Sequence, residues 1–220
     1  MAFGTRADAG RCLGHRLGHR RGGDTVVVGV ARGGVWVARA VAEVLAVPLD
    51  VVVAQRVVDP FLPGRTVGAV VDGVVTTLDV PVPQRAGFWL ERLPLATDAL
   101  VADVERRARR ISGGRAPEDL DGRTAVVVDD GVVTGMTARA ACRAVRVRGA
   151  QRVVLAAPVA SLDAMLGLQD VAEEIVCVHT PQWMPGGLPR WYREFPTVTD
   201  DDVAEVLRRH AATGAAPATA

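Results

Sequence analysis

One stretch, residues 125–138, constrains the fold of this chain more than any other. It reads Ala-Val-Val-Val-Asp-Asp-Gly-Val-Val-Thr-Gly-Met-Thr-Ala. Four apolar, mostly β-branched residues are typical of a buried strand, and they end at Asp129 and Asp130. Small and turn-forming residues follow, and then a segment of helical composition. The stretch therefore predicts a strand, a tight loop and a helix, with two carboxylates at the edge where open parallel sheets bind ligands.

The same alternation recurs along the chain. Apolar runs predict strands at 25–30, 49–54, 123–129, 153–157 and 174–178, and helical patterns follow at 35–45, 136–148 and 161–168. Residues 68–71 and 74–78, joined by Asp72-Gly73, predict a β-hairpin. Strands that alternate with helices favour an α/β fold with a parallel, doubly wound sheet.

Further helices are expected before, between and after these strands. An amphipathic helix is expected at 7–20, because Ala9, Cys12, Leu13 and Leu17 share one helical face. Pro81, Pro83 and Pro94 are expected to break the chain before a charged helix at 98–111, and another helix is expected at 200–210. We expect a core over 1–178, a hood or lid with its closing helix over 179–210, and a disordered tail over 211–220.

The composition excludes several classes of protein. The chain has 220 residues, 49% of them apolar, and a formal net charge of +1, so no global charge indicates nucleic acid or an anionic membrane. No apolar run approaches the ~18 residues of a membrane-spanning helix. Three scattered cysteines without CxxC spacing suggest reduced thiols and a cytoplasmic protein. The arginines at 106, 107, 109 and 110 are interpreted as a solvated helix face.

Two further strand ends carry polar residues. Arg32-Gly33-Gly34 comes directly after the first strand, and Gln55-Arg56 ends the second. Adjacent glycines let the backbone approach an anion closely, although such a pair is more often only a turn. The spacing is not that of the dinucleotide-binding G-x-G-x-x-G turn, and the chain has no G-x-S-x-G of a serine hydrolase.

Aromatic residues concentrate in the expected lid. Only 4% of the chain is aromatic, yet Trp183, Trp191, Tyr192 and Phe195 fall within one short segment. Packing of these rings against the core and stacking on a flat ligand are both open interpretations. Trp191, Tyr192 and Phe195 are the candidates for an acceptor-side lid.

Residues 126–137 resemble the signature of type I phosphoribosyltransferases, in which two acids and small residues precede Thr-Gly-x-Thr. The run Val30-Ala-Arg-Gly-Gly-Val35 is similar to the family's pyrophosphate loop. Three further segments, at 113–117, 120–124 and 191–196, are similar to a branch of predicted bacterial phosphoribosyltransferases. The resemblance covers roughly residues 6–207, and it implies a Rossmann-like parallel sheet flanked by helices with a small C-terminal hood.

The resemblance also implies a reaction and its residues. The donor would be phosphoribosyl pyrophosphate bound with Mg²⁺, and the acceptor a small heterocyclic base. Asp129 and Asp130 would be the catalytic carboxylates, which bond the ribose hydroxyls and hold the metal, directly or through water. The 5-phosphate loop would comprise Gly131, Val133, Thr134, Gly135, Met136 and Thr137. Pyrophosphate would be held by Arg32, Gly33, Gly34 and Arg56. We also expect a homodimer.

Two departures from the family pattern leave alternatives open. The strand end that is often Arg-Lys in this branch is Gln55-Arg56, which leaves a neutral residue at the first position. Val133 stands where 6-oxopurine phosphoribosyltransferases commonly carry an aspartate as general base, which disfavours hypoxanthine or guanine as acceptor. The alternative to an enzyme is a non-catalytic regulatory protein that binds the same donor.

Overall fold

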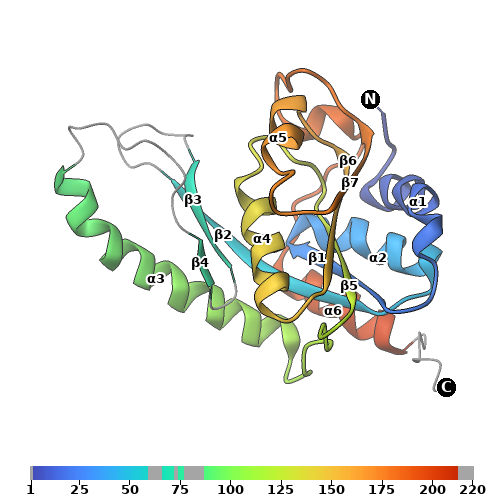
Figure 1. The fold of residues 1–220 in the computed structure, drawn as a ribbon, viewed down its shortest axis with the longest axis horizontal. Helices are drawn as coiled ribbons and strands as arrows, with labels where there is room; N and C mark the ends of the chain where they lie inside the picture. The colour runs from blue at the N-terminus through green and yellow to red at the C-terminus, as the bar shows by residue number, and fades with distance from the viewer. Residues whose placement is uncertain (1, 59–65, 72–73, 77–86, 213–220) are drawn as a thin grey trace.

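The computed structural model describes residues 2–58, 66–71, 74–76 and 87–212, and within these ranges the chain forms one seven-stranded sheet with helices on both faces (Figure 1). The strands are β1 (Thr25–Ala31), β2 (Leu49–Val58), β3 (Thr66–Val71), β4 (Val74–Thr76), β5 (Thr124–Val128), β6 (Arg152–Val159) and β7 (Glu174–His179). The helices are α1 (Arg6–Arg16), α2 (Gly33–Leu45), α3 (Gly87–Ser112), α4 (Met136–Val147), α5 (Leu162–Gly167) and α6 (Asp200–Ala212), with 3₁₀ turns η1 (Gly18–Arg20) and η3 (Leu188–Trp191).

The strand order indicates where along the sheet a ligand would bind. The order is β4-β3-β2-β1-β5-β6-β7, with parallel pairing from β2 through β7 and antiparallel pairing of β3 with β2 and β4. From β1 the chain proceeds to β2 on one side, and it later returns to β5 on the other. The neighbours β1 and β5 therefore flank a topological switch point, where ligands bind outside the carboxyl ends of the strands.

The two faces of the sheet build two cores, because successive side chains of a strand point to opposite faces. In β1, Val27 packs with residues of α1, α2 and α6, whereas Val26 and Val28 pack with residues of α4 on the other face. All seven residues of β1 are buried, as expected for a parallel strand covered on both sides. The α/β fold predicted from the sequence is confirmed.

Several predicted elements differ from the structure in detail. Helix α3 begins at Gly87 and runs through Pro94, so the predicted break at that proline is wrong. A single proline removes one backbone hydrogen bond, and this helix has 26 residues to offset the loss. The hairpin pairing of β3 with β4 is confirmed, whereas its turn at 72–73 lies outside the described residues. Residues 211 and 212 belong to α6 rather than to a tail, and 213–220 lie outside the described residues.

The N-terminal helix is confirmed, with one residue misplaced. Thr5 caps α1 through its hydroxyl, which accepts a hydrogen bond from Asp8 N–H, and the Asp8 carboxylate accepts one from Thr5 N–H in return. Leu13 and Leu17 are fully buried as predicted. Cys12, however, is exposed, because it lies beside the buried face of the helix rather than on it.

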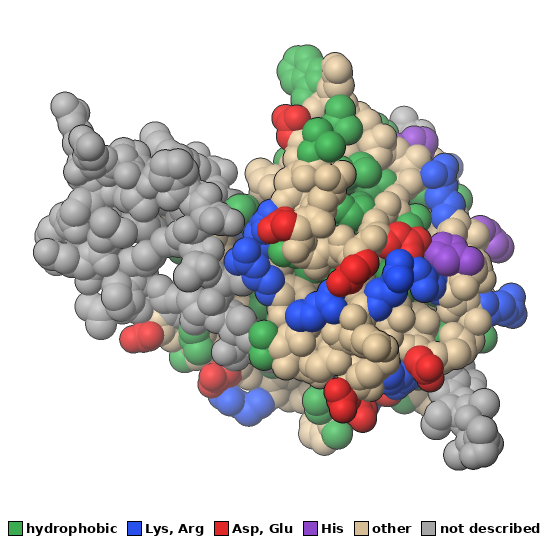
Figure 2. Space-filling model, in the orientation of Figure 1, with side chains coloured by type: hydrophobic (Ala, Val, Ile, Leu, Met, Phe, Trp, Pro, Cys, Tyr) green, Lys and Arg blue, Asp and Glu red, His purple; other side chains and the backbone are tan. Residues whose placement is uncertain are grey.

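Charge is mixed on the surface. Figure 2 shows acidic and basic side chains interspersed on the face that it displays. In the predicted arginine cluster of α3, the exposed members Arg106, Arg109 and Arg110 pair with carboxylates of Asp103, Glu105 and Asp201. None of the helices in the described ranges combines the length and apolar character that a membrane crossing requires.

Candidate active site at the carboxyl edge of the sheet

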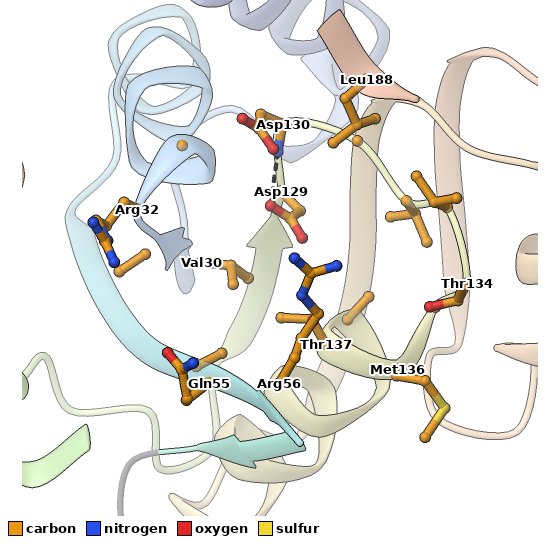
Figure 3. Close-up of a pocket in the computed structure, with 18 of the residues that line it drawn as sticks. Val30, Arg32, Gln55, Arg56, Asp129, Asp130, Thr134, Met136, Thr137 and Leu188 are labelled. Carbon is orange, nitrogen blue, oxygen red and sulfur yellow. Dashed lines mark hydrogen bonds between the residues drawn. The ribbon is translucent and has the colours of Figure 1, made fainter. Parts of the chain in front are cut away.

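A cavity of about 390 Å³ lies at the switch point, at the carboxyl ends of β1, β2 and β5 (Figure 3). Its wall is built from residues 30–33, 54–56 and 129–138, together with Arg107 of α3 and Leu188 of η3. Most of the residues predicted to bind ligands therefore share one space. Arg107 and Leu188 were not predicted to belong to it.

The loop that follows β5 ends in a helix N-terminus open to the cavity. Gly135 is the residue before α4 and has φ 79°, a left-handed conformation that favours glycine. Among the described residues no side chain caps this helix, so the first N–H groups of α4 and the partial positive charge of its dipole face the cavity. Thr134 is exposed and Thr137 partly so. The loop therefore offers backbone amides and two hydroxyls to an anion.

The two aspartates lie beside this loop, in different surroundings. Asp129 extends into the cavity from the end of β5, and its Oδ1 accepts the backbone N–H of Asp130 at 2.9 Å (Figure 3). Asp130 is buried, and its Oδ2 lies 2.8 Å from the Nε of Arg6 in α1. Burial raises the pKa of both carboxyls; the charge of Asp130 raises the pKa of Asp129 further, and Arg6 opposes the rise at Asp130. A cation or hydroxyl donors bound beside these two carboxylates would therefore stabilise their charged forms.

Arg6 fixes Asp130 from the far end of the chain, and nothing in the sequence pattern indicated this. The guanidinium donates from Nη1 to the backbone carbonyl of Pro196 at 2.8 Å and lies 3.7 Å above the ring of Phe195. The hydroxyl of Tyr192 donates to the backbone carbonyl of Asp130 at 2.5 Å. Segments near both termini thus hold the acidic pair in place.

The glycine pair at the start of α2 is required by close packing. A Cβ on Gly33 would lie 2.0 Å from Oδ2 of Asp130, and a Cβ on Gly34 would lie 2.7 Å from the carbonyl oxygen of Val128. Neither position has room for a side chain. Gly33 lines the cavity beside Asp130, whereas Gly34 packs against β5 and is not part of the lining.

Arginines line the side of the cavity that faces Asp129 and the loop after it. Figure 3 shows the guanidinium of Arg56 pointing into the cavity toward Asp129, and Arg56 draws the pKa of Asp129 downward against the larger effect of burial. Arg32 also lines the cavity, and its Nε lies 3.5 Å from the carboxylate of Asp200 at the start of α6. The predicted pair Arg32 and Arg56 is thus brought to one space.

Arg107 contradicts the interpretation of its cluster as a solvated face. It is buried, pairs with Asp200 at 3.0 Å and lines the cavity. A signal for this was present in the sequence, because Val104, Arg107 and Ile111 follow helical spacing and Val104 and Ile111 are fully buried or nearly so.

The predicted acceptor-side rings lie elsewhere. Trp191, Tyr192 and Phe195 pack in a cluster with Phe3, and the Tyr192 and Phe195 ring centroids are 5.0 Å apart. None of the three lines the cavity. Trp183 is 74% exposed and lines a second hollow of about 540 Å³ on the other side of the 133–136 loop. The structure therefore does not bring the three rings predicted for an acceptor-side lid to this cavity.

The acidic pair fits a hard cation. In the described part of the chain no three His, Cys, Asp or Glu side chains cluster as a complete protein-only metal site. Mg²⁺, however, uses only one or two carboxylates and takes its other ligands from water and phosphate oxygens. Asp129, with its carboxylate in the cavity, and the adjacent Asp130 offer oxygen ligands of that kind.

Comparison with known proteins agrees with this geometry. The sequence model of the family described as "Phosphoribosyl transferase domain" matches residues 7–165. A crystal structure of the protein TT1426 from Thermus thermophilus superimposes with a TM-score of 0.77 and 35% identity, covering 95% of this chain and 99% of that one. The likeness thus extends over nearly the whole chain.

Curated relatives give the same indication. Two proteins from two strains of Mycobacterium tuberculosis, each named "Putative phosphoribosyl transferase", are 39% identical to this chain over 207 residues, which is 94% of it. The match covers 46% of each relative, so the chain spans about half the length of the curated relatives it matches.

Proposed function

Because the chain belongs to the phosphoribosyl transferase domain family, we propose that it transfers 5-phosphoribose from phosphoribosyl pyrophosphate to a nitrogenous base or related acceptor and releases pyrophosphate. One observation carries the proposal. A single cavity holds two carboxylates, an uncapped helix N-terminus and three arginines. The donor has the matching parts, which are a ribose with two hydroxyls, a 5-phosphate and a pyrophosphate.

The 5-phosphate binds at the 131–137 loop. The first N–H groups of α4 and the hydroxyls of Thr134 and Thr137 donate to its oxygens, and the helix dipole favours its negative charge. The phosphate anchors one end of the donor, so that the ribose lies over the strand end that carries Asp129.

The acidic pair acts on the ribose. Asp129 accepts hydrogen bonds from the ribose hydroxyls, and Asp130, held by Arg6, adds negative charge beside it. This charge stabilises the positive character that develops at C1 as the bond to pyrophosphate breaks. Asp129 and Asp130 would hold Mg²⁺, directly or through water, and the ion would supply positive charge to the departing pyrophosphate. Arg32 and Arg56 bind that group on the opposite wall.

The acceptor enters the face of C1 opposite to pyrophosphate, so the reaction inverts the configuration there. Val133 is 41% exposed in the phosphate loop and offers no proton acceptor. We therefore expect acceptors that need no carboxylate base from this position, which disfavours 6-oxopurines.

Titration calorimetry with phosphoribosyl pyrophosphate at millimolar Mg²⁺ tests donor binding. Asp129→Asn should weaken binding about tenfold or more, since a hydrogen bond to a charged group contributes ~1.5–3 kcal/mol. Asp98→Asn, an exposed aspartate on α3, is the matched control and should bind as the wild type does. Absence of donor binding by the wild-type protein would reject the proposal.

A second assay separates an enzyme from a regulatory protein that only binds the donor. The protein is incubated with donor, Mg²⁺ and a panel of nitrogenous bases, and pyrophosphate release is followed. Release that depends on one base and is lost in Asp129→Asn is the result expected of the enzyme. Donor binding with no release for any base would favour the regulatory protein.

A further inference from the structure

A buried guanidinium from a distant helix reaches the donor cavity. The side chain of Arg107 is 10% exposed, and it extends from the second half of α3 to the wall formed by the end of β2. Its Nη1 donates to Oε1 of Gln55 at 3.3 Å. A permanently charged group is costly to bury unless its partners satisfy it.

The partners of Arg107 within the described residues use only part of its donor capacity. Asp200 accepts from Nε at 3.0 Å and from Nη2 at 3.1 Å, and Gln55 accepts from Nη1. A guanidinium has five N–H donors. One N–H on each terminal nitrogen therefore has no acceptor in the described part of the chain, and Arg107 belongs to the cavity lining.

The positive charge around Asp200 also exceeds the negative charge. Its carboxylate pairs with Arg107, and it lies 3.5 Å from Nε of Arg32, which lines the same cavity. One negative charge thus faces two positive charges, and Arg56 adds a third on the same wall. Gln55, which lies among them, contributes no charge. Among the described residues, positive charge therefore exceeds negative charge at this wall of the cavity.

We propose that Arg107 is a binding residue for the pyrophosphate group of the donor, positioned by Asp200, and that it supplies from α3 the cation that Gln55 does not supply from β2. The inference rests on the proposed function, because it assigns one more residue to the same donor site. A guanidinium with two unused N–H groups suits a pyrophosphate, whose oxygens accept paired hydrogen bonds.

The two halves of the donor are tested separately, by calorimetry with inorganic pyrophosphate plus Mg²⁺ and with ribose 5-phosphate. Arg107→Gln should weaken pyrophosphate binding about tenfold or more, the loss expected for a charge-assisted contact. Ribose 5-phosphate binding should change less than about twofold, because that ligand uses the 131–137 loop, and this also shows that the variant is folded. Arg110→Gln is the matched control, because Arg110 lies on the same helix and pairs with Asp201 but is exposed.

A relocated charge provides the sharper test. In the double variant Arg107→Gln with Gln55→Arg, the new arginine starts from a side chain that contacts Arg107 in the wild type. We expect it to recover at least half of the lost pyrophosphate affinity on a logarithmic scale. No recovery would overturn the inference, as would equal weakening of pyrophosphate and ribose 5-phosphate in Arg107→Gln. If wild-type protein binds neither pyrophosphate nor the donor, the proposed function itself fails, which is a distinguishable result.

Discussion

Replacing Arg6 by methionine is expected to be among the most destabilising single changes in this chain. Methionine keeps most of the length of the side chain and removes its charge. The change leaves the carboxylate of Asp130 buried without its cation, and it also removes the donor to Pro196. The matched control is Arg11→Met, because Arg11 belongs to the same helix and pairs with Asp8 while both side chains are largely exposed.

The burial of each ion pair determines how much stability is lost when its arginine is replaced. The side chains of Arg6 and Asp130 are 9% and 11% exposed, whereas those of Arg11 and Asp8 are 57% and 42% exposed. Breaking a buried pair by removing one partner costs about 3–5 kcal/mol. An exposed pair contributes about 0–1 kcal/mol. At about 2–4 °C per kcal/mol for a chain of this size, Arg6→Met should lower the melting temperature by roughly 6–20 °C.

Urea unfolding of the wild type, Arg6→Met, Asp130→Asn and the double variant gives the coupling between the two side chains. Part of the loss in each single variant arises from the partner left buried, so the double variant should be more stable than the two losses added together predict. We expect a coupling free energy of about 2 kcal/mol or more in this cycle. A coupling below about 0.5 kcal/mol, or equal losses in Arg6→Met and Arg11→Met, would refute the assignment of the pair as a buried interaction.

Two further changes test other parts of the structure. Gly33→Ala places a Cβ 2.0 Å from the Asp130 carboxylate, so calorimetry should show donor affinity reduced about tenfold or more, while Gly18→Ala, with no atom near its Cβ, should bind normally. Burial lowers the pKa of His210, so the unfolded chain takes up its proton first as pH falls below about 6.5, and stability is lost there. Urea unfolding at pH 7.5 and 5.5 should therefore show a larger loss for the wild type than for His210→Gln, by up to about 1 kcal/mol, and an equal loss would contradict this role. The charged groups that act on His210 are Glu43, Arg39 and Arg115.

The fold was predictable from the sequence because its strands are buried on both faces. Such strands appear as nearly unbroken apolar runs, as in β1 and β6, and the turns between them carry glycine or proline. The acidic pair and its neighbouring 131–137 loop could be placed together for a different reason. They are continuous in sequence, so a local pattern contains the whole arrangement.

The rest of the site depends on contacts between distant segments. Arg6 reaches Asp130 across 124 positions, and Arg107 reaches Asp200 across 93. No local pattern encodes such a pair, although the helical spacing of Arg107 with Val104 and Ile111 indicates a buried face that the prediction of a solvated face missed. The aromatic residues could not be assigned for another reason. Composition does not distinguish a ring that packs in the protein, such as Tyr192, from one that contacts a ligand.

The position of Arg6 between Asp130 and the carbonyl of Pro196 has a consequence for biosynthesis. A ribosome adds about 5–20 residues per second, and the 190 positions between Arg6 and Pro196 thus take roughly 10–40 s to synthesise. Asp130 is added about two thirds of the way through that interval, and until Pro196 follows, the acidic pair lacks the segment that holds Arg6. The acidic pair therefore acquires its full set of contacts late in translation, and a chain that ended before Tyr192 would carry the signature sequence without them.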